Sequence, residues 1–181
     1  MNFKNHFLIS MPHIEDIYFS KSIIYILDQN PSGVTGIIIN KVISKNKSKL
    51  ILDETGLNKI TPNPDIYFGG PVETDRGIII HSCDYSNKNS IKVAKNISLT
   101  VHRDIIEDLL NGKGPKDYRF TFGFSGWDSN QLEREFENGD WLLIPLSYKF
   151  IFDIPDERKW LNISESIGLD IFNLFGSAGI S

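Results

Sequence analysis

The chain has 181 residues, of which 40% are apolar and 12% aromatic, and its formal net charge is −4. This length fits a single domain, and this composition is far from the polar, aromatic-poor composition of a disordered chain. Its apolar stretches are far shorter than the roughly 18 residues that a membrane-spanning helix needs. The apolar run at residues 7–9 is also too short for a signal peptide. We therefore expect a globular protein that does not enter a membrane.

Cysteine usage indicates a compartment, and the charge distribution argues against one class of partner. Cys83 is the only cysteine, so no internal disulfide can form and we expect a cytoplasmic location. Residues 1–100 carry eleven Lys or Arg and nine Asp or Glu, whereas residues 101–181 carry eight and fourteen. A DNA-binding surface must neutralise several phosphates, so the acidic second half argues against a nucleic-acid partner. One basic cluster is interpreted as a solvated loop, with an anionic partner as the alternative: Lys41, Lys45, Lys47 and Lys49.

In the first half, the sequence predicts strands and one hairpin. Segment 28–33 contains Pro31 and Gly33, which favour a reversal between the two strands that flank it. Those strands are apolar along their length rather than alternating, so both faces of the sheet should be covered. A short helix is expected over residues 50–57 and a loop over residues 82–90. The predicted strands are residues 6–10, 22–27, 34–40, 66–68, 78–81, 91–93 and 97–100.

The second half adds helices with recognisable ends. One begins near Asp104 and has Gly112 at its expected left-handed cap, and the next covers residues 129–138 and stops at Gly139. A third follows Pro155 and ends at Gly168. Strands are predicted at residues 119–124, 141–144 and 150–153. Because strands and helices mix without a regular βαβ rhythm, we predict an α+β fold in a single domain covering residues 1–181.

A serine at a strand end is the first candidate for catalysis. The stretch Gly123-Phe124-Ser125-Gly126-Trp127 is interpreted as a strand-to-helix turn, but it has tryptophan where a nucleophile elbow needs its last glycine. No histidine follows residue 102 to act as the base. A hydrolase using Ser125 is therefore the least favoured hypothesis, and we expect no catalytic residues.

Histidine and cysteine give no metal or thiol motif. The four histidines lack the spacing of known zinc motifs, and one cysteine cannot build a zinc cluster. His81 and Cys83 project to the same side of a strand end, where packing explains them better than a thiolate and its base. We expect neither a metal nor a cofactor.

Two glycine-rich strand ends suggest a ligand site. Glycines at Gly69, Gly70 and Gly123 leave bare backbone that a ligand or another chain can approach. The hypothesis is a shared cleft, with Trp127 as an apolar wall and polar groups that orient the ligand. The alternative is two unrelated tight turns, with Trp127 in the core and Arg76 paired to a carboxylate. The candidate ligand-binding residues are Gly69, Gly70, Arg76, Ser125, Trp127, Gln131 and Glu133.

Several segments, taken in order, resemble the AlgH/YqgE family of bacterial proteins. The most specific are Phe68-Gly69-Gly70-Pro71-Val72 with Arg76-Gly77, and Gly126-Trp127 with Gln131-Leu132-Glu133. Others are Phe7 to Pro12, Ser22 to Tyr25, Gly36 to Lys41, and Phe152-Asp153 with Trp160. The resemblance covers nearly the whole chain. One departure is His102, where the family usually has a serine before the helix at Asp104.

The resemblance implies a fold and no activity. Members of the family have a branched, partly barrel-like mixed β-sheet surrounded by helices, and their label as transcriptional regulators carries no biochemical mechanism. We expect a non-catalytic cytoplasmic binding or regulatory protein, as a monomer or weak dimer, whose partner is a protein or a small molecule. A regulator that acts directly on DNA is the alternative. The predicted helices carry Glu107, Asp108, Glu133, Glu135 and Glu137, which do not suit a DNA recognition helix.

Overall fold

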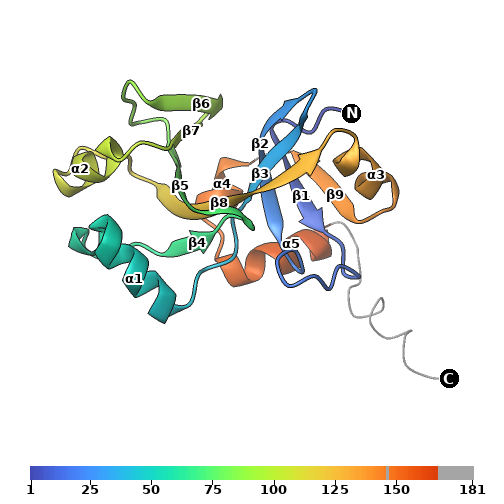
Figure 1. Ribbon diagram of the computed structural model, residues 1–181, viewed down its shortest axis with the longest axis horizontal. Coiled ribbons are helices and arrows are strands. Elements are labelled where there is room, and N and C mark those ends of the chain that lie inside the picture. Colours follow the sequence, from blue (N-terminus) through green and yellow to red (C-terminus); the bar gives the residue numbers. More distant parts are fainter. Residues whose placement is uncertain (146, 167–181) are drawn as a thin grey trace. The chain divides into compact units, whose positions relative to one another are not determined.

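The computed structural model describes residues 1–145 and 147–166, which form two compact units (Figure 1). The terminal unit combines residues 1–40 with the described residues from 126 onward. The central unit is Lys41–Ser125. Strand β8 (Tyr118–Asp128) contributes residues to both. The end predicted for the third helix at Gly168 lies outside the described residues.

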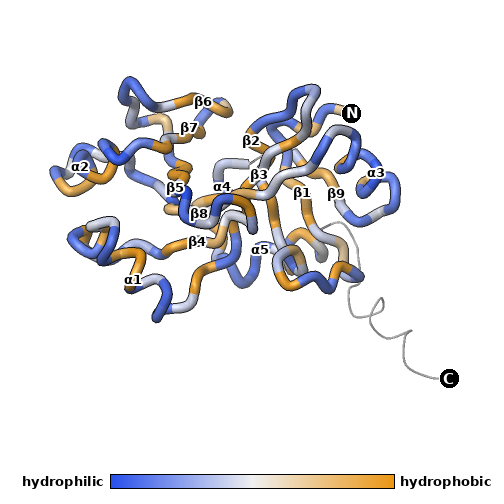
Figure 2. The backbone as a smooth tube through the Cα atoms, viewed as in Figure 1, coloured by the Kyte–Doolittle hydropathy of each residue, from blue (hydrophilic) through white to orange (hydrophobic). Residues whose placement is uncertain are grey.

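The terminal unit is an antiparallel sheet with three helices. Its strands follow the order β3, β2, β1, β9, with the last residues of β8 beside β3. Figure 2 shows hydrophobic residues along β1 and β9 and hydrophilic residues along α3. The elements are β1 (His6–Ser10), β2 (Ile23–Asn30), β3 (Gly33–Ile38), α3 (Gln131–Glu137), β9 (Trp141–Pro145), α4 (Tyr148–Phe152) and α5 (Asp156–Ser166).

The predicted hairpin of β2 and β3 is confirmed. The two strands pair antiparallel, with Tyr25 opposite Ile37 and Asn30 opposite Gly33. The reversal takes only the two residues between the strands, because polar residues 28–30 extend β2 beyond its apolar part. The apolar residues of β2 from Ile23 to Ile26 are all buried. Their burial agrees with the prediction that this sheet is covered on both faces.

Tyr25 places a phenol in this core without a hydrogen-bond partner among the described residues. Its ring contacts Phe7 edge to face, and burial raises its pKa. We expect Tyr25→Phe to keep or increase the free energy of unfolding, by up to about 1 to 2 kcal/mol, because it removes a polar group that burial disfavours.

Urea unfolding of Tyr25→Phe and Tyr85→Phe side by side tests this expectation. Tyr85 also has a buried ring, but its hydroxyl donates to Asp108 Oδ2 at 2.6 Å and accepts from Asn87 Nδ2 at 2.7 Å. Tyr85→Phe should therefore lower the free energy of unfolding by about 1 to 2 kcal/mol. Equal losses in both variants would show that the Tyr25 hydroxyl is also bonded in solution.

One predicted strand of the terminal unit is wrong. Residues 150–153 were expected to be extended, but they fall in helix α4 and its C-cap. A short apolar run fits a buried helix turn as well as a strand, so sequence periodicity does not separate them. Here Phe150 and Ile151 are buried, and Tyr148 and Phe152, four residues apart, bring their ring centroids to 4.8 Å.

The central unit is a mixed sheet with two α-helices. Its strands follow the order β6, β7, β5, β8, all antiparallel, while β4 lies off this path and pairs parallel to β8. This branch confirms the α+β fold class with a branched mixed sheet. The elements are α1 (Lys45–Thr55), a 3-10 helix η1 (Leu57–Lys59), β4 (Ile66–Phe68), β5 (Val72–Ser82), β6 (Ser90–Ala94), β7 (Ile97–Thr100) and α2 (Asp104–Leu110).

The lysine-rich segment differs from the prediction. Helix α1 begins at Lys45, so most of the expected loop is helical. Lysine is a good helix former, and Leu52 is buried on the side that packs in the core of the central unit. Gly56 ends the helix in the left-handed conformation, with φ of 78°. The basic cluster therefore lies largely along a helix rather than on a loop.

The stretch around Ser125 also differs. Residues 123–127 were interpreted as a strand-to-helix turn, but β8 continues through them to Asp128. The chain turns later, at Asn130, whose φ is 61°, and helix α3 starts at Gln131. Asparagine tolerates this left-handed conformation better than most residues, so it can make the turn without glycine.

Candidate functional site

The two glycine-rich segments lie against each other within the central unit. The amide of Gly69 donates to the carbonyl of Phe122 at 2.8 Å. A Cβ on Gly69 would stand 2.2 Å from the Gly123 carbonyl oxygen, and one on Gly70 would stand 2.2 Å from the Phe124 carbonyl carbon. The glycines therefore let two backbone segments touch. The ligand cleft proposed for these residues stays a prediction.

Ser125 and Arg76 belong to the same region. Ser125 is buried, and its hydroxyl donates to the Gly69 carbonyl oxygen at 3.4 Å. Arg76 is exposed, pairs with Glu73 Oε2 at 3.0 Å, and has its guanidinium 5.9 Å from the Phe124 ring centroid. These contacts tie the serine to the glycine backbone and the arginine to a neighbouring carboxylate.

The other three candidates belong to the terminal unit, where they surround a carboxylate that sequence reasoning did not select. Glu135 Oε2 accepts from the indole nitrogens of Trp127, at 2.9 Å, and Trp141, at 2.8 Å. Its Oε1 accepts from Gln131 Nε2 at 2.8 Å. Glu133, on the same helix, lies 4.0 Å from the N-terminal amine instead. Glu135 thus organises two of the predicted residues.

Trp127 is part of an aromatic cluster around this carboxylate. Its ring centroid lies 6.0 Å from that of Trp141 and 6.2 Å from that of Phe19. Both tryptophans are 5% exposed. Sequence spacing alone could have suggested the Glu135 contact with Gln131, four residues away on one helix face, but not the contacts from the tryptophans.

His81 and Cys83 do not form a thiol and base pair. His81 is fully buried, with Nδ1 2.9 Å from the Ser82 carbonyl oxygen and Nε2 3.0 Å from Thr100 Oγ1. Cys83 Sγ lies 3.1 Å from Ser98 Oγ. Each side chain thus has its own partners, as the packing interpretation expects. Within residues 1–145 and 147–166, no group of three or more His, Cys, Asp or Glu side chains is arranged to hold a metal ion.

Burial lowers the pKa of His81, although the Ser82 carbonyl and the Asp84 charge act in the opposite direction. The folded state therefore binds this proton less readily than the unfolded state, whose histidine has a pKa of about 6.5. Stability contributed by neutral His81 is complete above that value and is lost as the pH falls below it.

We expect wild type to lose more stability than His81→Gln between about pH 6.5 and 5, because glutamine takes up no proton there. Urea unfolding at several pH values gives the difference between the two proteins. That difference should be flat above about pH 7 and should shrink on acidification. Parallel curves for the two proteins down to pH 5 would contradict a buried neutral histidine.

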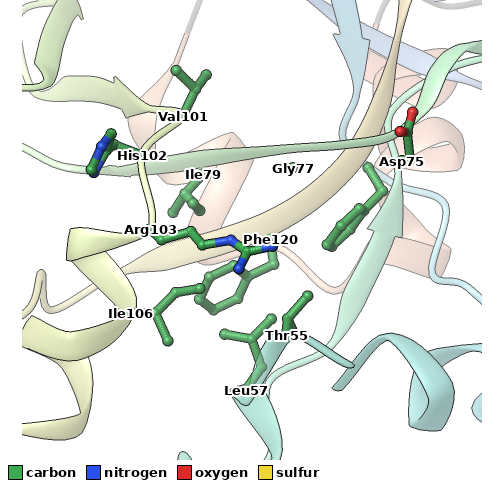
Figure 3. A pocket seen from close by; sticks show the side chains of 11 residues that line it. Thr55, Leu57, Asp75, Gly77, Ile79, Val101, His102, Arg103, Ile106 and Phe120 are labelled. Carbon is green, nitrogen blue, oxygen red and sulfur yellow. The ribbon is translucent and has the colours of Figure 1, made fainter. Parts of the chain in front are cut away.

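A pocket of about 150 Å³ lies in the central unit (Figure 3). Strands β5 and β8, the C-terminal end of α1 and the start of α2 provide its lining. The apolar part includes Leu57, Ile79 and Phe120, which are 1%, 5% and 2% exposed. The full lining is Thr55, Leu57, Asp75, Gly77, Ile79, Val101, His102, Arg103, Ile106, Phe120 and Phe122.

Charged side chains stand at the edge of this pocket. Figure 3 shows Arg103 reaching toward Phe120, with Asp75 at the opposite end and its carboxylate directed away from Phe120. His102 Nδ1 lies 2.8 Å from Asp104 Oδ1. The guanidinium of Arg103 makes no hydrogen bond or ion pair with any residue that the structure describes, whereas its backbone carbonyl accepts from the Ile106 amide at 2.9 Å. The pocket therefore combines an apolar floor with one uncommitted guanidinium.

Sequence reasoning missed this pocket because its lining comes from four separate segments. One signal was present: Gly77 lies inside strand β5, and glycine in a strand often marks a place where another group approaches closely. A second was His102, the departure from the family pattern that precedes Arg103. Neither signal indicates a pocket until the fold brings both segments together.

None of the helices in the described part of the chain has the length and apolar character to cross a membrane.

Comparison with known proteins identifies relatives along nearly the whole chain. The AlgH-like family model matches residues 7–172. The UPF0301 protein Mmwyl1_0539 of Marinomonas sp. is 36% identical over 98% of this chain and 96% of its own length. The UPF0301 protein YqgE of Escherichia coli O127:H6 is 35% identical over 99% of both chains.

Similar solved structures include two that cover more than nine tenths of this chain. The solution structure of the AlgH protein from Pseudomonas aeruginosa has a TM-score of 0.73 and 28% identity, covering 99% of this chain and 96% of that one. The crystal structure of protein DIP2367 from Corynebacterium diphtheriae has a TM-score of 0.76 at 17% identity, covering 94% and 90%, and shows the shared fold. The family match and the identity of these relatives agree with the resemblance in the sequence, and the chain belongs to the AlgH-like family.

Proposed function

We propose that this chain is a non-catalytic cytoplasmic protein that binds a small ligand in the pocket of its central unit, in a regulatory role. The observation that carries the proposal is an opening lined by buried Leu57, Ile79 and Phe120 beside an uncommitted Arg103. Small-molecule sites combine apolar walls with a few polar groups that fix orientation, and this lining has that composition.

The volume sets the size of the ligand. A cavity of about 150 Å³ holds a single benzene ring, whereas drug-sized ligands need roughly 300 to 1,000 Å³. The pocket thus suits one ring or one branched aliphatic group. The favourable free energy of binding comes from the apolar surface of the ligand and of the lining that binding removes from water.

The proposal is non-catalytic because the candidate groups lack catalytic neighbours. The lining holds no serine or cysteine, and the Thr55 hydroxyl donates to the Ile51 carbonyl oxygen at 2.6 Å, so His102, which is paired with Asp104, has no free nucleophile in the lining to act on. Ser125, the nucleophile of the hydrolase hypothesis, is buried and bonded to backbone. Direct action on DNA finds no support in helices α2 and α3, whose first turns hold Asp104, Glu107 and Glu133.

Binding of a neutral ring compound tests the pocket itself. We expect benzamide to shift the methyl signals of Leu57, Ile79 and Ile106 in NMR titrations, with a dissociation constant on the order of 1 mM, as suits so small a ligand. Ile106→Phe should weaken this binding at least about tenfold by filling the pocket.

The matched control is Leu110→Phe, on the same helix but outside the lining and 41% exposed. It should leave benzamide binding unchanged. Benzamide shifts that are absent, or that survive Ile106→Phe at full strength, would contradict the proposed site.

A further inference from the structure

We infer that the pocket selects a small apolar carboxylate, such as a ring or branched aliphatic acid, whose carboxylate is held by Arg103. This inference rests on the proposed function and names its ligand class. The inference is based on the position of the Arg103 guanidinium. It has no partner in the described chain and is directed over the pocket toward Phe120 (Figure 3).

The charges around the pocket favour an anion at Arg103. The other basic group of the lining, His102, is paired with Asp104 at 2.8 Å. Asp104 also accepts from Asn89 Nδ2 at 3.3 Å, so its carboxylate is engaged on two sides. These contacts leave Arg103 as the lining cation free to meet a ligand among the described residues.

Asp75 is the competing group, because it would attract an amine. It belongs to β5 at the far end of the lining, and its oxygens point away from Phe120 in Figure 3. A ring seated on Phe120 therefore has its polar substituent nearer to Arg103 than to Asp75. The side chain of Asp75 defines the edge of the pocket rather than its centre.

The chemistry of arginine specifies the anion. A guanidinium presents parallel N–H groups that match the two oxygens of a carboxylate, and such charge-assisted hydrogen bonds are stronger than neutral ones. A guanidinium is also less strongly hydrated than an ammonium, so it gives up less hydration free energy when a ligand displaces water beside the apolar lining. An acid whose apolar part fills about 150 Å³ contacts the apolar lining with that part and Arg103 with its carboxylate.

Three probes of one size test the inference on the full chain: benzoate, benzamide and benzylamine. We expect benzoate to bind at least about tenfold more tightly than benzamide, and benzylamine to bind most weakly. Arg103→Gln should bring the affinity for benzoate down to that for benzamide. Asp75→Asn should keep the order of the three. Because Arg103 and Asp75 are both exposed, neither substitution disturbs the core.

The outcomes separate the inference from the proposed function. Benzamide that binds as tightly as benzoate would overturn the carboxylate inference and leave the pocket intact as a binding site. Tightest binding of benzylamine, lost in Asp75→Asn, would assign the site to cations. Failure of all three probes to shift the pocket methyls would overturn both proposals.

Discussion

Gly123→Ala is expected to lower the free energy of unfolding by about 4 kcal/mol or more. Gly123 has φ of 76°, and a Cβ there would stand 2.3 Å from the Gly70 carbonyl oxygen and 3.1 Å from that of Val72. Both contacts are with backbone, so no flexible side chain can move aside. Because β8 and the Gly70 segment must separate to admit a methyl group, the loss combines conformational strain with a broken contact.

Gly56→Ala separates these two causes. Gly56 lies in the same unit with nearly the same φ, 78°, but a Cβ there meets nothing within 4 Å. Its substitution should cost only the left-handed conformation, about 1 to 2 kcal/mol. Urea unfolding followed by circular dichroism measures both variants. Equal losses would mean that the backbone contact at Gly123 contributes nothing.

Glu135→Ala is expected to cost about 2 to 5 kcal/mol, because it leaves two buried indole N–H groups without an acceptor. Trp127 and Trp141 both donate to its Oε2, at 2.9 and 2.8 Å. The chain has three tryptophans, at positions 127, 141 and 160, and all belong to the terminal unit. Tryptophan fluorescence therefore follows the unfolding of that unit.

Glu137→Ala is the matched control, since it removes the same charge from the same helix at an exposed position. We expect a change within about 0.5 kcal/mol. The fluorescence spectrum of folded Glu135→Ala should also differ from wild type, because two indoles change their hydrogen bonding. Similar stability in the two variants would argue that the indoles find other acceptors in solution.

Local pattern determined most elements of the fold. Strands His6–Ser10, Ile66–Phe68 and Ile97–Thr100 and helix Asp104–Leu110 begin and end where the sequence places their apolar runs and caps. These elements depend on neighbours in sequence: a turn residue on either side and a side-chain period that matches one geometry. The family motifs, which are also local strings, identified the fold class and its branched sheet.

Only tertiary packing decided the rest. Phe150 and Ile151 are helical because their apolar side chains fit the core of the terminal unit as one turn, a choice that the short apolar run at residues 150–152 leaves open. The role of Glu135 as a shared acceptor also depends on the fold. Trp127 and Trp141 lie eight residues before it and six after it, and only the folded chain brings both indole nitrogens to its Oε2.

The candidate site shows the same division. The sequence marked the glycines at positions 69, 70 and 123 as places of close approach, because their residue type alone permits it. What approaches them is backbone of the same chain, and this follows from the pairing of β4 with β8, in which Ile66 lies opposite Phe120. The pocket beside Arg103 could not be predicted from the sequence for a related reason. Its shape and volume depend on the side chains of four segments that meet only in the folded chain.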